Sequence, residues 1–306
     1  MKLHINIGQH PGEGRTNLLT CPVPEYQPIP DRLAVLGCGL LGTSVALAAK
    51  AARPDCEIVG FDISDTTLLN LGDKFDRIAP TVGEAVDDAD AICIAVNVLA
   101  GPAVLEEIAP ELRPDTFVFD TLSTKRSIVD AAELVMQSPV RFVGSHPMAG
   151  GEKGGPEAAR ADLFKNAPCI VTPNAATDEQ SLLRVESFWS AVGCRVTRMY
   201  PSHHDRLAAS VSHMPHIFAA AMVRHPEDLA LNHAGTGFRD ATRIAAGDAK
   251  LWADIITDNR DEVLLAMEEC VGELREFATI LQEQTLDREA MIRWLDGAAR
   301  RRKAID

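Results

Sequence analysis

Short, nearly continuous apolar runs recur along the first two thirds of the chain, and stretches with helical periodicity separate them. The runs are RLAVLG, EIVGFD, AICIAV, TFVFD, RFVGS, CIVTP and CRVTRM, and LLGTSVALAAKAA is one of the helical stretches between them. Continuous rather than alternating apolar runs indicate strands that are buried on both faces, which is typical of a parallel sheet flanked by helices. Residues 32–200 are therefore predicted to form an α/β domain of the Rossmann type. Residues 1–31 show no sustained periodicity and are predicted to form an N-terminal extension.

From residue 201 the pattern becomes entirely helical. The stretch DRLAASVSHMPHIFAAAMV is predicted to be one helix that contains Pro215. A longer stretch begins near Lys250 and carries apolar residues at three-, four- or eight-residue steps as far as Leu281. One helix of that length would span roughly 50 Å, more than the width of a small domain, so we expect a second copy of the chain to cover it. Residues 201–306 are predicted to form an all-α substrate and dimerisation domain, and the protein a homodimer.

The first apolar run leads directly into a glycine pattern. Gly37, Gly39 and Gly42 lie between a predicted strand and an amphipathic helix, and Asp62 ends the next strand twenty residues after Gly42. In this arrangement the glycines let a pyrophosphate approach the N-terminus of the helix, and the acid binds the ribose hydroxyls. A carboxylate at that position favours NAD over NADP. The predicted cofactor-binding residues are Gly37, Gly39, Leu40, Leu41, Gly42, Asp62 and Asn97.

A histidine stands at the start of the stretch GSHPMAGGEKGG, residues 144–155, which holds five glycines. We expect a flexible loop there, just after the strand RFV. Ligands of open α/β sheets collect beyond the carboxyl ends of the strands, so His146 is predicted to face the nicotinamide end of the cofactor. An imidazole with a pKa near 6.5 is a suitable general base at neutral pH.

Three segments together resemble the prephenate/arogenate dehydrogenases of tyrosine biosynthesis. They are GSHPMAGGEKGG, VSHMPH and GFRDATRIAAGDAKLWADI, and the resemblance extends over residues 32–285. It implies an NAD-dependent oxidative decarboxylation: the ring carbon that bears the hydroxyl loses a hydride, the ring carboxylate leaves as CO2, and the ring becomes aromatic. We expect prephenate to be the substrate. The alternative is an enzyme that acts on arogenate or on both compounds.

The resemblance also implies roles for individual residues. His146 matches the catalytic base, and Ser123 matches a serine that hydrogen-bonds the histidine and the substrate hydroxyl. Without the family, Ser123 is equally well explained as a helix N-cap. Arg243 matches the arginine that binds a substrate carboxylate. Further substrate contacts are implied for His216, for Arg239 one turn before Arg243, for Glu152 and Asp205 at the entrance, and for Trp252 at the subunit boundary.

Composition and the remaining residues restrict the partners, metal ions and alternative functions that the chain could have. The 306-residue chain has a net charge of −14, which argues against nucleic acid and membrane surfaces as partners. Its seven cysteines form no CxxC pair and are expected to be reduced thiols of a cytoplasmic protein. The histidines at 203, 204, 213 and 216 lack a fixed acid or thiolate partner, so no metal is expected. Two rival functions are a β-hydroxyacid dehydrogenase, for which the catalytic lysine is missing, and a non-catalytic NAD-binding dimer.

Overall fold

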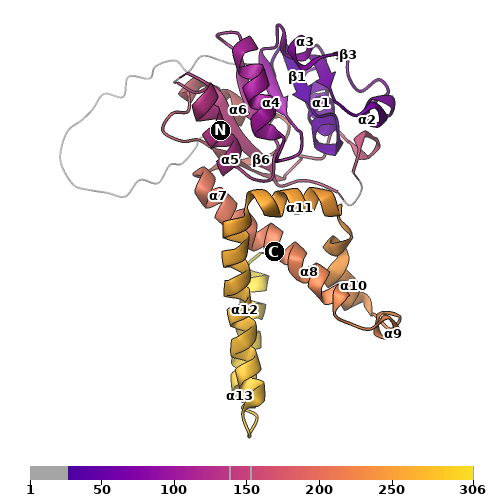
Figure 1. Ribbon diagram of the computed structural model, residues 1–306, viewed down its shortest axis with the longest axis vertical. Helices are drawn as coiled ribbons and strands as arrows, with labels where there is room; N and C mark the ends of the chain where they lie inside the picture. The colour runs from indigo at the N-terminus through magenta and orange to yellow at the C-terminus, as the bar shows by residue number, and fades with distance from the viewer. Residues whose placement is uncertain (1–26, 138, 152–153, 306) are drawn as a thin grey trace, which may run out of the picture.

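The computed structural model describes residues 27–137, 139–151 and 154–305. An α/β domain forms the upper part of the molecule in Figure 1, and the C-terminal helices extend below it. Residues 1–26 of the predicted extension lie outside the described residues. Ile29, which the sequence assigns to that extension, is 3% exposed and packs in the core of the α/β domain.

One eight-stranded sheet runs through the α/β domain in the order β3-β2-β1-β4-β5-β6-β7-β8. Neighbouring strands are parallel except for β6 and β7, which are antiparallel. The strands are β1 Arg32–Leu36, β2 Glu57–Phe61, β3 Arg77–Ile78, β4 Ala91–Ile94, β5 Phe117–Asp120, β6 Phe142–Pro147, β7 Pro168–Thr172 and β8 Arg195–Arg198.

Alternate residues of the central strands face two separate hydrophobic cores. In β1, Leu33 and Val35 pack on one side of the sheet with α1 and α6, whereas Ala34 and Leu36 pack on the other side with α3, α4 and α5. Both faces are therefore covered, which explains why the strands read as continuous apolar runs. The helices of this domain are α1 Leu40–Ala52, α2 Asp65–Leu69, α3 Val82–Val86, α4 Gly101–Ile108, α5 Arg126–Val135 and α6 Glu179–Ala191.

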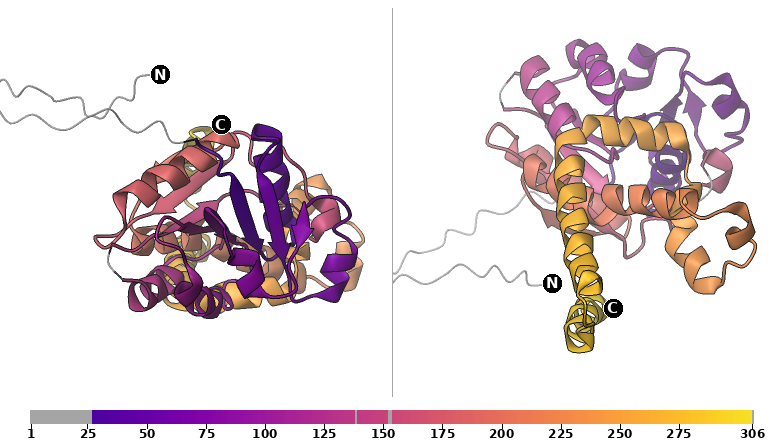
Figure 2. Two further views of the ribbon diagram at one scale, coloured as in Figure 1. Left: turned by 90° about the horizontal axis from the view of Figure 1, so that it is seen from above. Right: turned by 60° about the horizontal axis from the view of Figure 1, so that its bottom comes forward.

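The C-terminal part is all helical, as predicted. Its helices α12 and α13 lie side by side and antiparallel, and Phe277 and Trp294 pack between them with ring centroids 4.8 Å apart (Figures 1 and 2). None of the helices in the described part of the chain has the length and apolar character needed to span a bilayer. The helices here are α7 Pro201–Ala208, α8 Met214–Arg224, α9 Asp228–Leu231, α10 Thr236–Thr242, α11 Ala249–Asp258, α12 Arg260–Gln282 and α13 Arg288–Lys303.

The predicted single long helix from residue 250 is wrong, because the chain turns sharply at Asn259. Helix α11 lies along the underside of the α/β domain, and α12 leads away from it (Figure 1). Asn259 leaves helical geometry with φ −111° and ψ 30°. Its side chain is fully buried and donates to the carbonyl oxygen of Asp205 at 2.7 Å. A tertiary contact of a buried amide thus interrupts a periodicity that continues in the sequence.

The predicted helix around Pro215 is interrupted as well. Between α7 and α8 the residues Ala209–His213 form a π-helical turn, in which the Met214 N–H bonds back to the Ala209 carbonyl. Proline lacks an N–H group, and a wider turn beside it is one way to accommodate the missing bond. The turn places His213 beside Trp252 of α11, with ring centroids 6.3 Å apart.

Candidate active site

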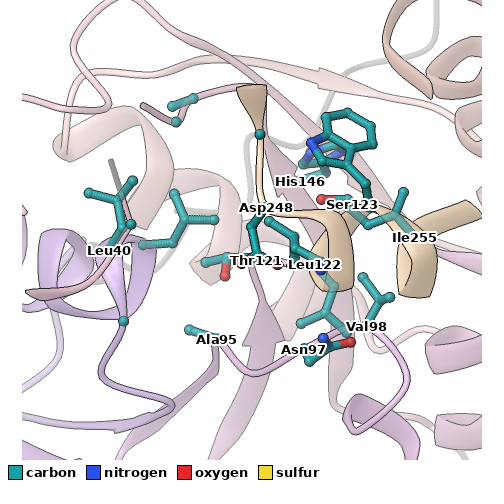
Figure 3. Close-up of a pocket in the computed structure, with 18 of the residues that line it drawn as sticks. Leu40, Ala95, Asn97, Val98, Thr121, Leu122, Ser123, His146, Asp248 and Ile255 are labelled. Atoms are coloured by element: carbon teal, nitrogen blue, oxygen red, sulfur yellow. Dashed lines mark hydrogen bonds between the residues drawn. The ribbon is translucent and has the colours of Figure 1, made fainter. Parts of the chain in front are cut away.

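A cavity of about 630 Å³ lies where the carboxyl ends of the central strands meet the π-helical turn and α11. Figure 3 shows its wall, with Leu40 at one end, Asn97 and Val98 below, and His146 and Ser123 together at the other end. Ligands of open α/β sheets bind at this edge. Of the predicted site residues, those that line the cavity are Gly39, Leu40, Leu41, Asn97, Ser123, His146 and Trp252.

The glycine loop after β1 has the backbone geometry that a dinucleotide needs. Gly37 has φ +96°, and a Cβ there would lie 2.5 Å from the carbonyl oxygen of Ala95. A Cβ on Gly42 would collide with the Gly37 carbonyl. A Cβ on Gly39, in contrast, would meet nothing within 4 Å. Gly37 and Gly42 are thus required for the fold of the loop, whereas Gly39 leaves open space beside the N-terminus of α1, where a pyrophosphate fits.

Asp62 and Asn97 fix the loops around this end of the cavity. The carboxylate of Asp62 accepts the backbone N–H of Cys38 at 2.7 Å and that of Ser64 at 2.8 Å. It therefore ties the end of β2 to the glycine loop, at the edge where a ribose would lie. The Asn97 amide donates to Asp254 of α11 at 2.6 Å and so links the α/β domain to the helical domain.

His146 lies within strand β6 and not on the flexible loop that the glycine content predicted. It pairs with Ile170 of the antiparallel neighbour β7, and β6 continues to Pro147. The described glycines that follow, Gly150, Gly151, Gly154 and Gly155, line the same cavity. The base is therefore held by the sheet, and these glycines form part of the cavity wall.

A chain of hydrogen bonds runs from His146 into the interior. Its Nδ1 lies 2.9 Å from Nε2 of His204, and Nδ1 of His204 lies 2.8 Å from a carboxylate oxygen of Asp205. Asp205 also accepts the backbone N–H groups of Lys125 and Arg126, at 2.8 and 2.9 Å, at the start of α5.

This arrangement corrects two expectations. Asp205 is 1% exposed and lies behind the cavity, so it is not at the entrance. Ser123 is not the N-cap of α5, because that helix starts at Arg126 and Asp205 binds its first free N–H groups. Asp205 of α7 therefore caps α5, which is the role that the sequence also allowed for Ser123.

The histidines of the site are neutral at physiological pH. Burial, followed by the neighbouring His204 and Lys125, holds the pKa of His146 well below 6.5. Burial also lowers the pKa of His204, although Asp205 opposes that shift. For His213 burial lowers the pKa to about 4. Neutral imidazoles can accept a proton or donate a hydrogen bond, as a base and a positioning group must.

His213 and His216 take up different places from those expected. His213, predicted to be a supporting residue, lines the cavity, and its Nδ1 lies 3.2 Å from the Asn259 amide nitrogen. His216, predicted to contact substrate, lies outside the cavity wall and stacks on Trp252 with ring centroids 3.7 Å apart. Trp252, predicted at the subunit boundary, stands in the cavity wall of its own chain.

The predicted arginines do not line the cavity that contains His146. Arg243 lines a second cavity of about 460 Å³, which shares Gly150, Gly151, Gly247 and Trp252 with the first. His146 and Arg243 therefore belong to adjoining cavities and not to a single one. Arg239 is exposed on α10 and lines neither cavity. Glu152 lies outside the described residues. Within the described part of the chain, no group of three or more His, Cys, Asp or Glu side chains is placed to hold a metal ion.

Two family models match consecutive parts of the chain. The model for the nucleotide-binding domain of prephenate dehydrogenase matches residues 45–198, and the model for its dimerization domain matches residues 200–296. The chain belongs to the prephenate dehydrogenase family. The predicted Rossmann-type fold and NAD-dependent oxidoreductase class are confirmed, and the β-hydroxyacid dehydrogenase interpretation is set aside.

Individual relatives agree with this family. Prephenate dehydrogenase of Bacillus subtilis (strain 168) is 36% identical over 278 residues, which are 88% of this chain and 74% of the relative. Cyclohexadienyl dehydrogenase of Zymomonas mobilis is 33% identical, over 83% of this chain and 90% of the relative. One similar solved structure is that of A. aeolicus prephenate dehydrogenase in complex with hydroxyphenyl propionate and NAD+. It superposes with a TM-score of 0.80 at 28% sequence identity, and the match covers 90% of this chain and 98% of the A. aeolicus chain.

Three polar residues at the site carry no predicted role, namely Asp120, Lys125 and His204. Lys125 and Asp120 form an ion pair in which both side chains are fully buried, directly behind His146. Lys125 also donates to the carbonyl oxygen of Ser145 at 3.0 Å, and Asp120 accepts the Ser145 N–H at 2.7 Å. A signal existed in the sequence: the apolar strand TFVF ends in an acid that is followed five residues later by a lysine.

Proposed function

We propose that the protein catalyses the NAD-dependent oxidative decarboxylation of prephenate to 4-hydroxyphenylpyruvate, the step that the family resemblance assigns to tyrosine biosynthesis. NAD, when bound, accepts the hydride. The glycine loop, the N-terminus of α1 and Asp62 hold the dinucleotide, and the reacting end lies in the cavity with His146. The observation that carries the proposal is that His146 and the nucleotide loop residues Gly39–Leu41 line one cavity.

His146 acts as the general base. Its Nδ1 is turned to His204, so Nε2 is the ring nitrogen that remains for a ligand. Nε2 takes the proton of the substrate hydroxyl while the hydride leaves the same ring carbon. The electron pair of the breaking bond to the carboxylate then restores aromaticity, and the imidazolium returns the proton to the oxygen of the phenol product. Ser123 lies beside His146 in the cavity and orients that hydroxyl (Figure 3). A depressed pKa keeps the base unprotonated at neutral pH.

Arg243 anchors a substrate carboxylate at the junction of the two cavities. The guanidinium lines the adjoining cavity, and the shared walls at Gly151, Gly247 and Trp252 leave the two spaces next to each other. A substrate that extends from His146 past Trp252 brings an acid group toward this arginine. A bidentate guanidinium–carboxylate contact suits a dianionic substrate of a protein with net charge −14.

We also propose that the protein is a homodimer through its C-terminal helices. Large apolar side chains that are 41–55% exposed gather on α12 and α13; they are Leu264, Leu265, Leu274, Leu281 and Leu295. An exposed apolar surface of this kind on a helix pair is typical of an interface, and this part of the chain matches the dimerization domain of the family.

The function is tested by following NADH absorbance with NAD and either prephenate or arogenate. We expect turnover of prephenate, together with a large loss of kcat in His146→Asn at unchanged NAD affinity. His203→Asn is the matched control, because His203 is an exposed histidine one residue from His204. No NADH with either substrate, or a fully active His146→Asn variant, contradicts the proposal.

The same assay decides the substrate. Arogenate carries an ammonium group where prephenate has a ketone, so an acid in the cavity would favour arogenate. Asp205, one of the two acids expected at the entrance, is buried behind the cavity and bound to His204, so it is not placed to bind that ammonium group. Asp248 also lines the cavity, but its carboxylate caps α11 by accepting the Leu251 N–H at 2.7 Å, so we expect kcat/KM to be higher for prephenate. The arogenate or dual-specificity alternative, which the Zymomonas mobilis relative named cyclohexadienyl dehydrogenase keeps open, predicts the reverse or near-equal values.

A further inference from the structure

Two hydrogen-bond chains start at Asp205 and end at the two imidazoles of the cavity wall. One runs from its carboxylate through His204 to His146, and the other runs from its backbone carbonyl through Asn259 to His213. All five residues lie at 8% exposure or less, so water does not compete for these bonds. The chains therefore determine which ring nitrogens carry hydrogen.

The carboxylate chain fixes His146. Burial tends to raise the pKa of Asp205, but the bonds from His204 and from the N–H groups of Arg126 and Lys125 outweigh it and keep that pKa below its usual value. An ionised carboxylate only accepts, so Nδ1 of His204 carries the hydrogen that it donates to Asp205. Nε2 of the neutral His204 then accepts, so the hydrogen between the two rings belongs to Nδ1 of His146. The Nε2 of His146 is left bare.

The amide chain fixes His213 in the opposite way. The Oδ1 of Asn259 accepts from a guanidinium nitrogen of Arg126 at 3.2 Å, and its Nδ2 donates to the Asp205 carbonyl at 2.7 Å. These two bonds determine the orientation of the amide. The same Nδ2 faces Nδ1 of His213 at 3.2 Å, so this ring nitrogen accepts. The hydrogen of the neutral ring is then on Nε2, which is buried and has no protein partner among the described residues.

We propose that Asp205 sets both tautomers, so that two residues of one cavity wall carry a bare imidazole nitrogen, on His146, and a buried imidazole N–H without a protein partner among the described residues, on His213. The pair matches a ligand that bears a hydroxyl, which donates to His146, and an oxygen that accepts from His213. An unpaired buried N–H is unfavourable, and such a ligand satisfies it. His204, Asn259 and Asp205 are positioning residues, and His213 is a substrate-contacting residue. The consequence for turnover rests on the proposed function, whereas the tautomers do not.

The tautomers are measured directly by long-range ¹H–¹⁵N NMR of the ligand-free, ¹⁵N-histidine-labelled full chain at pH 7.5. We expect a pyridine-type Nε2 and a protonated Nδ1 for His146, and the reverse for His213. Loss of single signals in His146→Asn and His213→Asn assigns them. The reverse pattern in either ring of the unmodified protein overturns the proposal, even if every variant below fails to fold.

Two variants each perturb one of the two hydrogen-bond chains. Asp205→Asn replaces the acceptor of His204 but keeps the backbone carbonyl, so the His146 signals change and those of His213 do not. Asn259→Asp turns the amide donor into an acceptor, so His213 shifts its hydrogen to Nδ1 while His146 is unaffected. Equal changes at both histidines in either variant indicate a general structural effect and contradict the assignment.

Kinetics give the functional consequence. Asp205→Asn forces His146 toward the tautomer in which Nε2 carries hydrogen, and a wrong tautomer of a catalytic histidine lowers kcat by up to ~10⁴-fold. NAD affinity should be unchanged. Asn259→Asp should raise KM for prephenate but not for NAD. If the spectra are as expected and both variants keep normal kinetics, the tautomers have no role in turnover. If the unmodified protein does not oxidise prephenate at all, the proposed function fails while the tautomer assignment stands.

Discussion

The buried ion pair between Lys125 and Asp120 offers a sharp test of what holds His146 in place. Both side chains are 0% exposed, and the pair brackets Ser145, the residue before the base. Lys125→Met keeps the length of the side chain but removes its charge. It leaves the Asp120 carboxylate buried with the N–H groups of Ser145 and Leu122 as its remaining partners.

The expected loss of unfolding free energy is large. Removing one partner of a buried ion pair typically destabilises a protein by about 3–5 kcal/mol, because the other charge stays buried without compensation. Urea unfolding followed by circular dichroism, at one protein concentration for all variants, measures this loss. Lys165→Met is the matched control, because Lys165 is exposed and its replacement should change stability by less than about 0.5 kcal/mol.

The pH dependence identifies the cause. In Lys125→Met the folded state favours protonated Asp120, so the folded state binds more protons than the unfolded state, and the destabilisation should shrink as the pH falls from 8 to 5. The double variant Lys125→Met with Asp120→Asn should lose less than the sum of the single losses, with a coupling of about 2 kcal/mol or more. A loss below about 1 kcal/mol, or one that is independent of pH, would refute the uncompensated charge as its cause.

Three further predictions concern the glycine loop and the buried histidines. Gly37→Ala should lower Tm and NAD affinity together because its Cβ would lie 2.5 Å from the Ala95 carbonyl oxygen, whereas Gly39→Ala should weaken NAD binding, measured by calorimetry, at unchanged Tm. The pKa of His213 is about 4 in the folded chain, so the unfolded state binds more protons below pH 6.5. His213 alone should therefore reduce the unfolding free energy by about 3 kcal/mol between pH 6.5 and 4. In urea titrations His213→Asn should show a smaller fall of the unfolding free energy over the same pH range. Because the pKa of His146 is lowered well below 6.5, kcat/KM for prephenate should stay flat from pH 7.5 to 6.5, and an acid limb at or above 6.5 contradicts the assignment of the base.

The features of the fold that repeat along the chain were predictable from the sequence. The runs around Leu33, Ile92 and Phe119 indicate strands covered on both faces, and the structure buries all three residues completely. The glycine spacing likewise indicated the nucleotide loop. The φ of Gly37 is +96°, a backbone conformation that residues other than glycine rarely adopt. The break at Asn259 was not predictable, since the apolar periodicity continues through it. Its cause is a contact with Asp205, 54 residues earlier in the chain.

The site was less predictable than the fold for the same reason. Sequence motifs point to His146 and Arg243 as residue types, but they do not show which polar groups are buried together. Asp205 and His204 follow each other in an ordinary-looking helical segment, and only the packing of α7 against α5 turns them into partners of His146 and of the α5 N-terminus. The sequence argued against a metal at these histidines because no fixed acid partner was apparent, and it could not show that Asp205 is the hydrogen-bond partner of His204.

The position of His146 on β6 changes the argument for its chemistry. A base on a glycine-rich loop would have to be ordered at each turnover, and that ordering opposes the reaction by roughly 1–2 kcal/mol of backbone entropy for each residue. His146 is instead fixed by its β7 partner Ile170, by the buried pair behind Ser145 and by His204. The described glycines after Pro147, which are Gly150, Gly151, Gly154 and Gly155, line the same cavity without side chains. The motif therefore combines a preorganised base with glycines that shape the cavity wall, and substitutions of these glycines should affect KM more than kcat.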